Sequence, residues 1–378
     1  MPTIPPAPLD REQLALSLAP FGSSRMLPRD AYLSDDVLAW ERSHFFEGWM
    51  CLGRSAEIPA GGLRAESVGP YGVLLTRDKD RELRAFENTC RHRGHELLAC
   101  GGSADSPKAI VCPYHAWSYR HDGSLIGAPH FPEIDKSAFT LKPVRVQEWH
   151  GWVFVDRTGA AEDFTSYIGE LEEIVAPYDA GSLVTCESHE YEVAANWKVI
   201  IENYQECYHC SMIHPELCRV SPPTSGENLE RAGNWVGGWM DLRAGAETMS
   251  LDGRSGGVAM ARLDEHELST VMYVAVLPNL LISLHPDYVM THRLVPLTPV
   301  LTRITCSWAF PADVAAREGF SPAYAVDFWD LTNRQDWSAC ESVQRGMAAP
   351  HFEPGPLAPD EDGVYQFVHR MATAYQGS

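Results

Sequence analysis

Hydrophobic and polar positions change their pattern near residues 46 and 160 of the chain. Between these positions the sequence consists of short β-type runs interrupted by Gly, Pro and Asp, and the runs are Gly72–Thr76, Ala85–Asn88, Ala109–Cys112, Trp117–Arg120 and Trp152–Val155. Short strands with frequent turns predict a small antiparallel β domain. Residues 1–45 combine a Pro-rich start with a short helical candidate, Asp35–Phe46. We therefore expect an N-terminal segment at 1–45 that packs on the C-terminal domain, and a β domain at 46–160.

From about residue 161 to residue 378 the pattern becomes a mixture of helices and strands, so the predicted class is α+β. Helical spacing of apolar residues and typical capping residues predict three helices, which are Asn196–Cys210, Ser321–Gly346 and Glu361–Tyr375. Strand-like runs lie between Leu268 and Phe310. Only residues 219–262 lack a regular pattern, and they are expected to form a long irregular segment over a site.

Two short motifs in the predicted β domain combine cysteine with histidine. Cys90 and His92 form one pair, and Cys112 and His115 form the other. A 2Fe-2S cluster with two thiolates on one iron and two imidazoles on the other needs this mixed set from two turns. Imidazole ligands raise the reduction potential of the cluster, which suits accepting electrons from a reductase. A structural zinc site is the alternative, although zinc modules more often begin with two cysteines and end with two histidines.

A second set of candidate metal ligands lies in the C-terminal part. His209 and His214 belong to the segment NWKVIIENYQECYHCSMIHPEL. Five residues correspond to about 140° around an ideal helix, so both histidines can bind one metal only if the helix ends or bulges between them. Asp336 is the candidate carboxylate, because it shares an inward helical stripe with Trp329 and is costly there unless it binds a partner. Two histidines and one carboxylate form the facial triad of non-haem iron oxygenases, whereas a pair of buried histidines is the alternative.

Both motifs, in this order, resemble those of Rieske non-haem iron oxygenase α subunits. The resemblance rests on CRHRGHELL and VCPYHAWSY, on the segment with the two histidines, and on QDWSACESVQRGM and VYQFVHRM. It implies a small antiparallel β Rieske domain followed by a helix-covered antiparallel-sheet catalytic domain of the helix-grip type. It also implies a Rieske 2Fe-2S cluster, a mononuclear Fe(II), O2 as co-substrate, NAD(P)H used only through a separate flavin and iron-sulfur reductase, and a homotrimer.

The resemblance also gives Glu206 a role. In this family a carboxylate connects the cluster of one subunit to the iron of its neighbour, so Glu206 would link a neighbouring His115 to His209. The usual residue is aspartate, and glutamate within ENYQECYHC is similar to the branch acting on glycine betaine, carnitine and stachydrine. The expected function is oxidation, by N-demethylation, of a quaternary ammonium or betaine-type substrate, with Glu206 taking part in catalysis. Hydroxylation of an aromatic or alicyclic carbon is the enzymatic alternative, and a Rieske electron-transfer protein is the non-enzymatic one.

A quaternary ammonium substrate requires an aromatic cage, because it has no donor hydrogen and is held by ring faces. The candidate cage residues are Trp235, Trp239, Tyr273, Trp308 and Phe310. Arg293 and His292 are candidates for holding a substrate carboxylate. Cys207 and Cys210 flank His209, and we expect them to pack as small apolar thiols rather than to form a redox pair.

Charge and composition narrow the possible partners. The 378 residues carry a formal charge of -21, and long-range repulsion disfavours nucleic acid and anionic membranes. The ten cysteines do not form a secreted disulfide pattern. The first residues lack the pattern of a signal peptide, and the longest apolar stretch, Val271–Leu284, is too short to span a bilayer. We expect a cytoplasmic protein whose partners are a small-molecule substrate and a reductase.

Overall fold

The computed structural model describes residues 4–377, which divide into two compact units. The β unit is Arg42–Phe164, and the sheet–helix unit combines the described residues up to Glu41 with those from Thr165 onward. The sequence predicts these boundaries at 45 and 160, and it assigns the N-terminal segment to the second unit. The predicted α+β class is confirmed. None of the described helices is long and apolar enough to cross a membrane.

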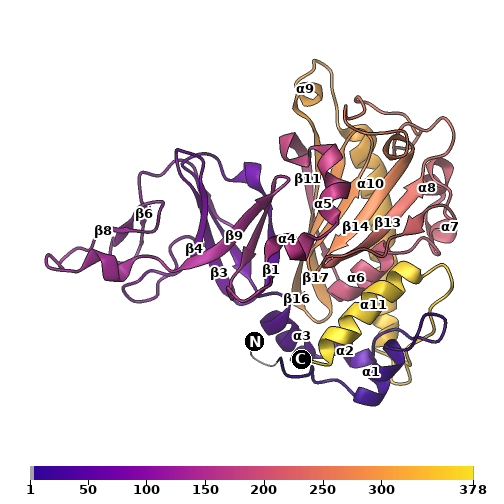
Figure 1. Ribbon diagram of the computed structural model, residues 1–378, viewed down its shortest axis with the longest axis horizontal. Coiled ribbons are helices and arrows are strands. Elements are labelled where there is room, and N and C mark those ends of the chain that lie inside the picture. The colour runs from indigo at the N-terminus through magenta and orange to yellow at the C-terminus, as the bar shows by residue number, and fades with distance from the viewer. Residues whose placement is uncertain (1–3, 378) are drawn as a thin grey trace. The chain divides into compact units, whose positions relative to one another are not determined.

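The β unit consists of antiparallel strands (Figure 1). One sheet has seven strands in the order β1-β10-β9-β4-β3-β2-β5, and a smaller sheet has three in the order β6-β7-β8. The strands are β1 (Trp49–Arg54), β2 (Leu63–Val68), β3 (Tyr71–Arg77), β4 (Leu83–Glu87), β5 (Ser103–Ala104), β6 (Ile110–Val111), β7 (Ser118–Tyr119), β8 (Leu125–Gly127), β9 (Pro143–Trp149) and β10 (Trp152–Asp156).

Strands β6 and β7 are shorter than the sequence predicts, because the chain turns at Cys112. The turn brings Ala116 to a φ of 57°, and the amide of Ala116 donates to the carbonyl of Cys112 at 3.0 Å. Cys90 and Cys112 belong to one core cluster together with Phe86 and Trp117. The turns that carry the two cysteine–histidine pairs are therefore anchored by packing on the small sheet.

The sheet–helix unit is built on a seven-stranded antiparallel sheet in the order β11-β17-β16-β15-β14-β13-β12 (Figure 1). Its strands are β11 (Leu183–Val193), β12 (Glu227–Asn228), β13 (Trp235–Asp241), β14 (Thr270–Val276), β15 (Leu280–Leu284), β16 (Val289–Thr298) and β17 (Leu301–Pro311). The α-helices of the described chain are α1 (Arg11–Ser17), α2 (Arg29–Leu33), α3 (Asp35–His44), α4 (Phe164–Ile168), α5 (Leu171–Val175), α6 (Trp197–Tyr204), α7 (Cys210–Ile213), α8 (Pro215–Val220), α9 (Ala312–Ala315), α10 (Ala323–Met347) and α11 (Asp362–Tyr375).

Strands β12 and β13 correct the prediction that residues 219–262 are irregular throughout. Gly237 and Gly238 interrupt the apolar pattern of β13, so the sequence pattern does not predict a strand there. Both glycines are required by close backbone neighbours. A Cβ atom at Gly237 would lie 2.1 Å from the carbonyl oxygen of Tyr273, and one at Gly238 would lie 2.0 Å from that of Glu227.

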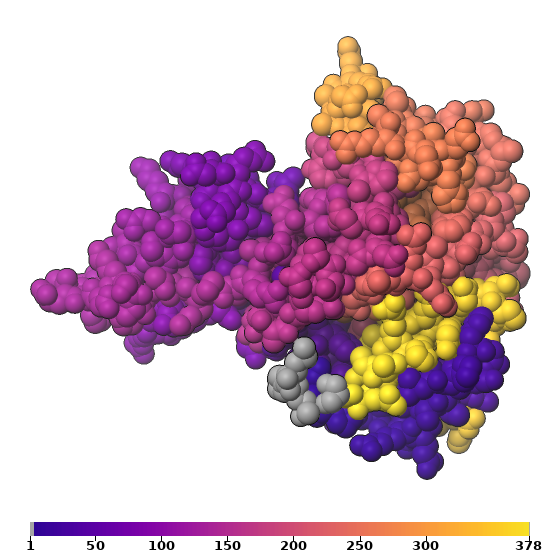
Figure 2. Space-filling model, viewed as in Figure 1, coloured from indigo at the N-terminus to yellow at the C-terminus, as the bar shows by residue number. Residues whose placement is uncertain are grey.

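The N-terminal segment packs on the helices of the sheet–helix unit. Helix α1 contacts α11, and α2 contacts α10; Figure 2 shows the yellow C-terminal helix against the indigo N-terminal segment. Glu41 of α3 is fully buried, and its carboxylate accepts hydrogen bonds from Lys198 Nζ at 2.6 Å, from Trp197 Nε1 at 2.8 Å and from the hydroxyl of Tyr375. This network joins α3, α6 and α11 and fixes the helix that leads into the site.

Candidate metal centres and the adjoining cavity

The two candidate histidines lie at the two ends of the short helix α7. Helix α6 ends at Tyr204, which corrects the prediction of one helix through Cys210. His209 stands at the N-terminal boundary of α7, and His214 stands between α7 and α8, directly before Pro215. Because the helix is interrupted, the histidines are released from the 140° separation that an uninterrupted helix would impose.

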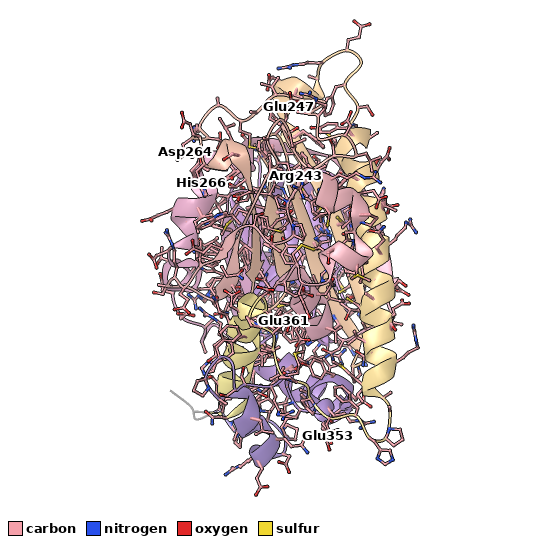
Figure 3. All side chains as sticks on the ribbon, turned by 90° about the vertical axis from the view of Figure 1, so that its right-hand side faces the viewer. Arg243, Glu247, Asp264, His266, Glu353 and Glu361 are labelled. Carbon is pink, nitrogen blue, oxygen red and sulfur yellow. A yellow bond between two sulfur atoms is a disulfide. The ribbon has the colours of Figure 1, made fainter. Side chains whose placement is uncertain are left out.

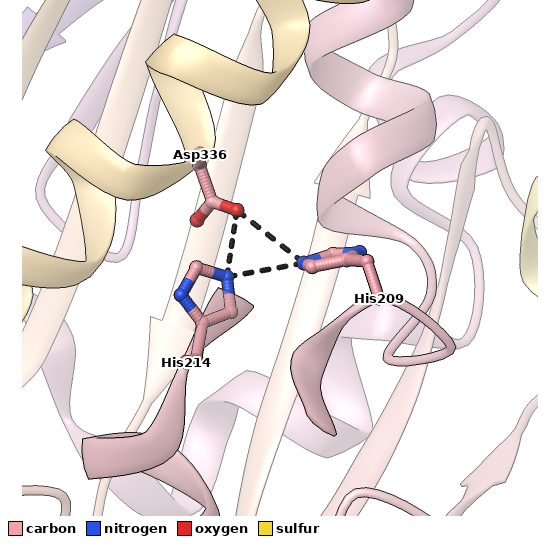
Figure 4. Close-up of side chains that lie close together, drawn as sticks. All are labelled: His209, His214 and Asp336. Atoms are coloured by element: carbon pink, nitrogen blue, oxygen red, sulfur yellow. Dashed lines mark hydrogen bonds and ion pairs between the residues drawn. The ribbon is translucent and has the colours of Figure 1, made fainter. Parts of the chain in front are cut away.

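The structure brings His209, His214 and Asp336 together (Figure 4). The Nε2 atoms of the two histidines are 3.1 Å apart. Asp336 Oδ1 lies 2.9 Å from His214 Nε2 and 3.3 Å from His209 Nε2. The three ligand atoms converge from two different elements, the α7 region and the long helix α10. Two imidazoles and one carboxylate with this convergence suit a ferrous ion, because further coordination positions stay open for small ligands.

The opposite nitrogen of each histidine has its own partner. Nδ1 of His209 lies 2.5 Å from Glu206 Oε1, and Nδ1 of His214 lies 2.7 Å from Gln335 Oε1. Glu206 Oε2 also accepts from the backbone amide of His209 at 3.1 Å. With Nδ1 donating, each ring presents Nε2 to the metal. Gln335 was not singled out from the sequence, although it directly precedes Asp336.

Acidic neighbours favour positive charge at this centre. Burial opposes protonation of His209, but hydrogen bonds with Asp336 and Glu206 outweigh it and raise the pKa of His209 to about 10 in the metal-free protein. Burial likewise opposes ionisation of Asp336, and hydrogen bonds from His209 and His214 override it and hold the pKa of Asp336 below its usual value. A divalent cation would take the place of the proton between these groups.

Cys207 and Cys210 form a disulfide in the structure, with their Cα atoms 4.9 Å apart. The expectation that they remain packed thiols is therefore wrong. Residues three positions apart are neighbours in a helical turn, so the spacing itself brings the two sulfur atoms close together. The disulfide closes a loop around His209, and Cys210 Sγ lies 4.0 Å from His209 Nε2.

The two cysteine–histidine pairs come together in the β unit. Cys90 and Cys112 are each 2% exposed, and burial, ahead of hydrogen bonding, raises the pKa of the Cys90 thiol. The ring centroids of His92 and His115 are 4.7 Å apart. Nδ1 of His92 is buried and has no hydrogen-bond partner among the described residues, as a metal ligand requires. Trp117 stacks on the His92 ring with centroids 4.9 Å apart and covers it.

A cavity of about 580 Å³ adjoins the three converging ligands in the sheet–helix unit. Its wall includes His209, His214 and Asp336 and five aromatic residues, which are Tyr204, Tyr208, Trp239, Tyr273 and Trp329. The rings of Tyr204 and Tyr273 meet edge-on with centroids 5.8 Å apart, and those of Tyr273 and Trp329 with centroids 6.2 Å apart. The Tyr273 ring thus contacts both of the other rings at one part of the wall.

The aromatic residues predicted from the sequence divide into two groups. Trp239 and Tyr273 line the cavity, whereas Trp235, Trp308 and Phe310 are at most 2% exposed and lie in the core. Trp308 and Phe310 share one face of β17, which packs into the core cluster of the unit. This placement corrects the predicted cage. Tyr204 and Trp329 also line the cavity, and neither was a candidate cage residue from the sequence.

Neither candidate for a substrate carboxylate lines the cavity. Arg293 and His292 lie on β16, outside the cavity wall of the described chain. Burial lowers the pKa of His292 to about 4, and its Nε2 lies 3.1 Å from Asn333 Oδ1. A neutral imidazole engaged in this way is unsuited to bind an anion.

A Cys₂His₂ cluster site in a β unit, together with a two-histidine, one-carboxylate centre beside an aromatic cavity, defines the class of Rieske non-haem iron oxygenases. The comparisons agree. Residues 48–140 match the Rieske [2Fe-2S] domain, and residues 181–377 match the catalytic domain of the ring-hydroxylating α subunit. The chain belongs to the family of ring-hydroxylating oxygenase α subunits.

Relatives with assigned activities extend over most of the chain. The glycine betaine monooxygenase oxygenase subunit of Chromohalobacter salexigens is 30% identical over 377 residues, covering 90% of this chain and 84% of the relative. The carnitine monooxygenase oxygenase subunit of Acinetobacter baumannii is 36% identical over 205 residues, covering 50% and 52%.

Solved structures share the fold. The quaternary ammonium Rieske monooxygenase CntA in complex with L-carnitine has a TM-score of 0.78 at 24% identity and covers 97% of this chain and 99% of its own. Naphthalene 1,2-dioxygenase from Rhodococcus sp., bound to indole, has a TM-score of 0.80 at 20% identity and covers 97% and 98%.

The protein is therefore an oxidoreductase with a Rieske 2Fe-2S cluster and a mononuclear iron, and it receives electrons from a separate reductase. The residues present fit both groups. The buried thiols and the partnerless Nδ1 of His92 supply thiolate and imidazole donors for the cluster. The Nε2 atoms of His209 and His214 and the carboxylate of Asp336 supply the donors for iron.

Proposed function

We propose that this oxygenase oxidises an N-methyl group of a quaternary ammonium substrate and releases formaldehyde. One observation carries the proposal: the cavity that contains the three iron ligands is also walled by Tyr204, Tyr273 and Trp329. Ring faces attract a quaternary ammonium through their negative quadrupole, and they do so most strongly where water is excluded. The relatives named for glycine betaine and carnitine support the same substrate class.

The proposed reaction balances with two reducing equivalents from the reductase. The iron supplies oxygen activation when it is bound. One atom of O2 is inserted into a C–H bond of the N-methyl group, and the other leaves as water with two electrons and two protons. The resulting N-hydroxymethyl ammonium breaks its C–N bond, which gives formaldehyde, a tertiary amine and a proton. The aromatic wall holds the ammonium so that a methyl group faces His209 and Asp336.

Glu206 is the proposed link for electron delivery. Its carboxylate is already joined to Nδ1 of His209, and it lines the cavity with its side chain 12% exposed. We propose that its exposed edge meets His115 of a second copy of the chain, so that electrons pass between subunits of a homotrimer. In this proposal His209, His214 and Asp336 bind the mononuclear iron. The two cysteine–histidine pairs of the β unit bind the 2Fe-2S cluster.

The test is a reconstituted assay with the purified holoprotein, a flavin and iron-sulfur reductase, NADH and a panel of trimethylammonium compounds. We expect substrate-dependent formaldehyde release together with NADH and O2 consumption. In His209→Ala the visible spectrum of the cluster should persist while mononuclear iron and formaldehyde are lost. His351→Ala, at an exposed histidine outside the cavity wall, is the matched control. Product formation by His209→Ala, or oxidation of an aromatic ring without formaldehyde, would refute the proposal.

A further inference from the structure

The charged side chains on the cavity wall, apart from the iron-ligand histidines, are all acidic. Besides Glu206 and Asp336 at the iron centre, three further carboxylates line the cavity, and they are Glu227, Asp360 and Asp362. Glu361, labelled in Figure 3, stands between the last two at the N-terminal boundary of α11. Within residues 4–377, no lysine or arginine lines this cavity.

The basic residues that follow β13 are engaged elsewhere. Arg243 donates from Nε to the carbonyl of Cys218 at 2.9 Å, and Arg254 donates to Glu247 Oε1 at 3.1 Å. Figure 3 shows Arg243 and Glu247 at the opposite end of the sheet–helix unit from Glu353. Neither arginine belongs to the cavity wall. A substrate carboxylate in the cavity would therefore meet carboxylates and find no arginine or lysine partner.

Two uncharged polar groups on the same wall have no partner. The hydroxyl of Tyr273 and Nε2 of Gln205 are buried without a hydrogen bond among the described residues. Tyr204 provides a contrast, because its hydroxyl donates to the carbonyl of Ile282 at 2.8 Å and lies 2.8 Å from Ser283 Oγ. Buried polar atoms are normally paired, so the two partnerless atoms indicate a place where a ligand supplies the hydrogen bond.

We propose that the substrate is a quaternary ammonium cation whose other end carries an uncharged hydrogen-bonding group, such as a hydroxyl, and no carboxylate. This inference rests on the proposed function and narrows it. The rings of Tyr204, Tyr273 and Trp329 receive the ammonium group. The Tyr273 hydroxyl and the Gln205 amide pair with the polar end, and the acidic wall favours a ligand that is positive overall.

Three small probes with the same trimethylammonium group separate these contributions. Tetramethylammonium has the cation alone, choline adds a hydroxyl, and glycine betaine adds a carboxylate. Their dissociation constants are measured by calorimetry on the holoprotein without reductase or reductant, so that no turnover occurs. One hydrogen bond should make choline bind about five-fold more tightly than tetramethylammonium. Glycine betaine should bind about ten-fold more weakly than choline, because its carboxylate finds no cation.

A pair of hydroxyl deletions tests the residue assignment. In Tyr273→Phe the preference for choline over tetramethylammonium should fall, because only the Gln205 amide is left to pair with the hydroxyl, while tetramethylammonium binds as before and so reports an intact fold. Tyr365→Phe is the matched control, because this tyrosine of α11 packs on Phe21 and lies outside the cavity wall. This control should keep the five-fold preference for choline.

A pair of charge deletions tests the acidic wall. Glu227→Gln, at an exposed position on the cavity wall, should weaken choline binding about two-fold and strengthen glycine betaine binding by a similar factor. Glu353→Gln removes a charge from an exposed residue outside the cavity wall, and it should change neither constant.

The outcomes distinguish this inference from the function on which it rests. Glycine betaine binding more tightly than tetramethylammonium would overturn the inference and leave the proposed function standing. Equal binding of choline and tetramethylammonium, or a choline preference that is undiminished in Tyr273→Phe, would overturn the assignment of the polar end. Failure of all three probes to bind would refute the proposed function and this inference with it.

Discussion

Replacing Glu206 by glutamine removes one negative charge beside His209 while keeping the length of the side chain. In the wild-type protein Glu206 Oε1 lies 2.5 Å from Nδ1 of His209, and Oε2 accepts from the backbone amide of the same residue at 3.1 Å. Glutamine retains one carbonyl oxygen for the ring, but its amide group would face the backbone N–H donor with donor hydrogens. One bond is lost, and the other changes from charge-assisted to neutral.

The magnitude follows from the bond to the ring, which orients the ligand nitrogen. A hydrogen bond to a charged group contributes about 1.5–3 kcal/mol and a neutral one about 1 kcal/mol, so this bond should weaken by about 0.5–2 kcal/mol. This corresponds to an iron affinity that is about 2–30-fold weaker, which overlaps the 10–100-fold range known for partners of metal-bound histidines. Iron affinity is measured by competition with a ferrous chelator, with the cluster absorbance as an internal reference. An affinity within two-fold of wild type would refute this reasoning.

A second measurement, the rate of cluster oxidation, distinguishes two roles of Glu206. One role is to position the His209 ring, and the other is to pass an electron between subunits. Glu206→Asp keeps the charge, but its side chain is one methylene shorter. It can therefore reach either Nδ1 or the backbone amide of His209, and not both. If Glu206 acts only by positioning the ring, the rate of cluster oxidation in a single turnover, normalised to bound iron, should equal that of wild type. If it also links the subunits, the normalised rate should fall in Glu206→Asp and fall further in Glu206→Gln. Glu230→Gln, an exposed glutamate, is the control for loss of one charge.

Two further predictions concern the buried groups behind the site. Lys198→Met should lower the free energy of unfolding in urea by about 3–5 kcal/mol, because it leaves the carboxylate of Glu41 buried without its cation; a loss below about 1 kcal/mol would contradict a buried ion pair. Burial raises the pKa of Glu202 from 4.5 to about 8, so its stabilising contribution is complete below pH 4.5 and is lost as the pH rises through 8. Glu202→Gln should therefore unfold like wild type at pH 4.5 and be more stable by up to about 4 kcal/mol at pH 9, whereas parallel pH profiles would contradict the shifted pKa.

The metal-ligand candidates were accessible from the sequence because they depend on local patterns. Asp336 lies on the 25-residue helix α10, and a helix of this length keeps its periodicity clear enough to assign an inward stripe. His209 and His214 required only that the helix be interrupted. The place of the interruption could not be predicted, since the residues after Tyr204 contain no glycine or proline before Pro215. The break is held by distant contacts, such as the bond of the Tyr204 hydroxyl to the Ile282 carbonyl.

The cavity wall was harder to predict than the ligands. Strand alternation places Trp308 and Phe310 on the same face of β17, but it does not tell whether that face meets the cavity or the core. Both are completely buried. Trp329, by contrast, was assigned to a helical stripe that faces the interior of the unit. This interior face also borders the cavity. Which apolar face borders an enclosed space depends on the packing of the helices over the sheet, and a single sequence does not contain that information.

The net charge of the chain says little about the substrate by itself. The positions of the individual charged residues are informative. A formal charge of -21 is compatible with many partners, because charges on a solvated surface are screened within about 10 Å. Asp336 and Glu206 are largely buried beside the two histidines and stabilise the cation bound between them. Asp362, which is partly buried, lies on the wall of the same cavity, where it favours a cation of a different kind. The same sign of charge therefore serves both the metal and the substrate, and a substrate anion would be disfavoured by the groups that retain the iron.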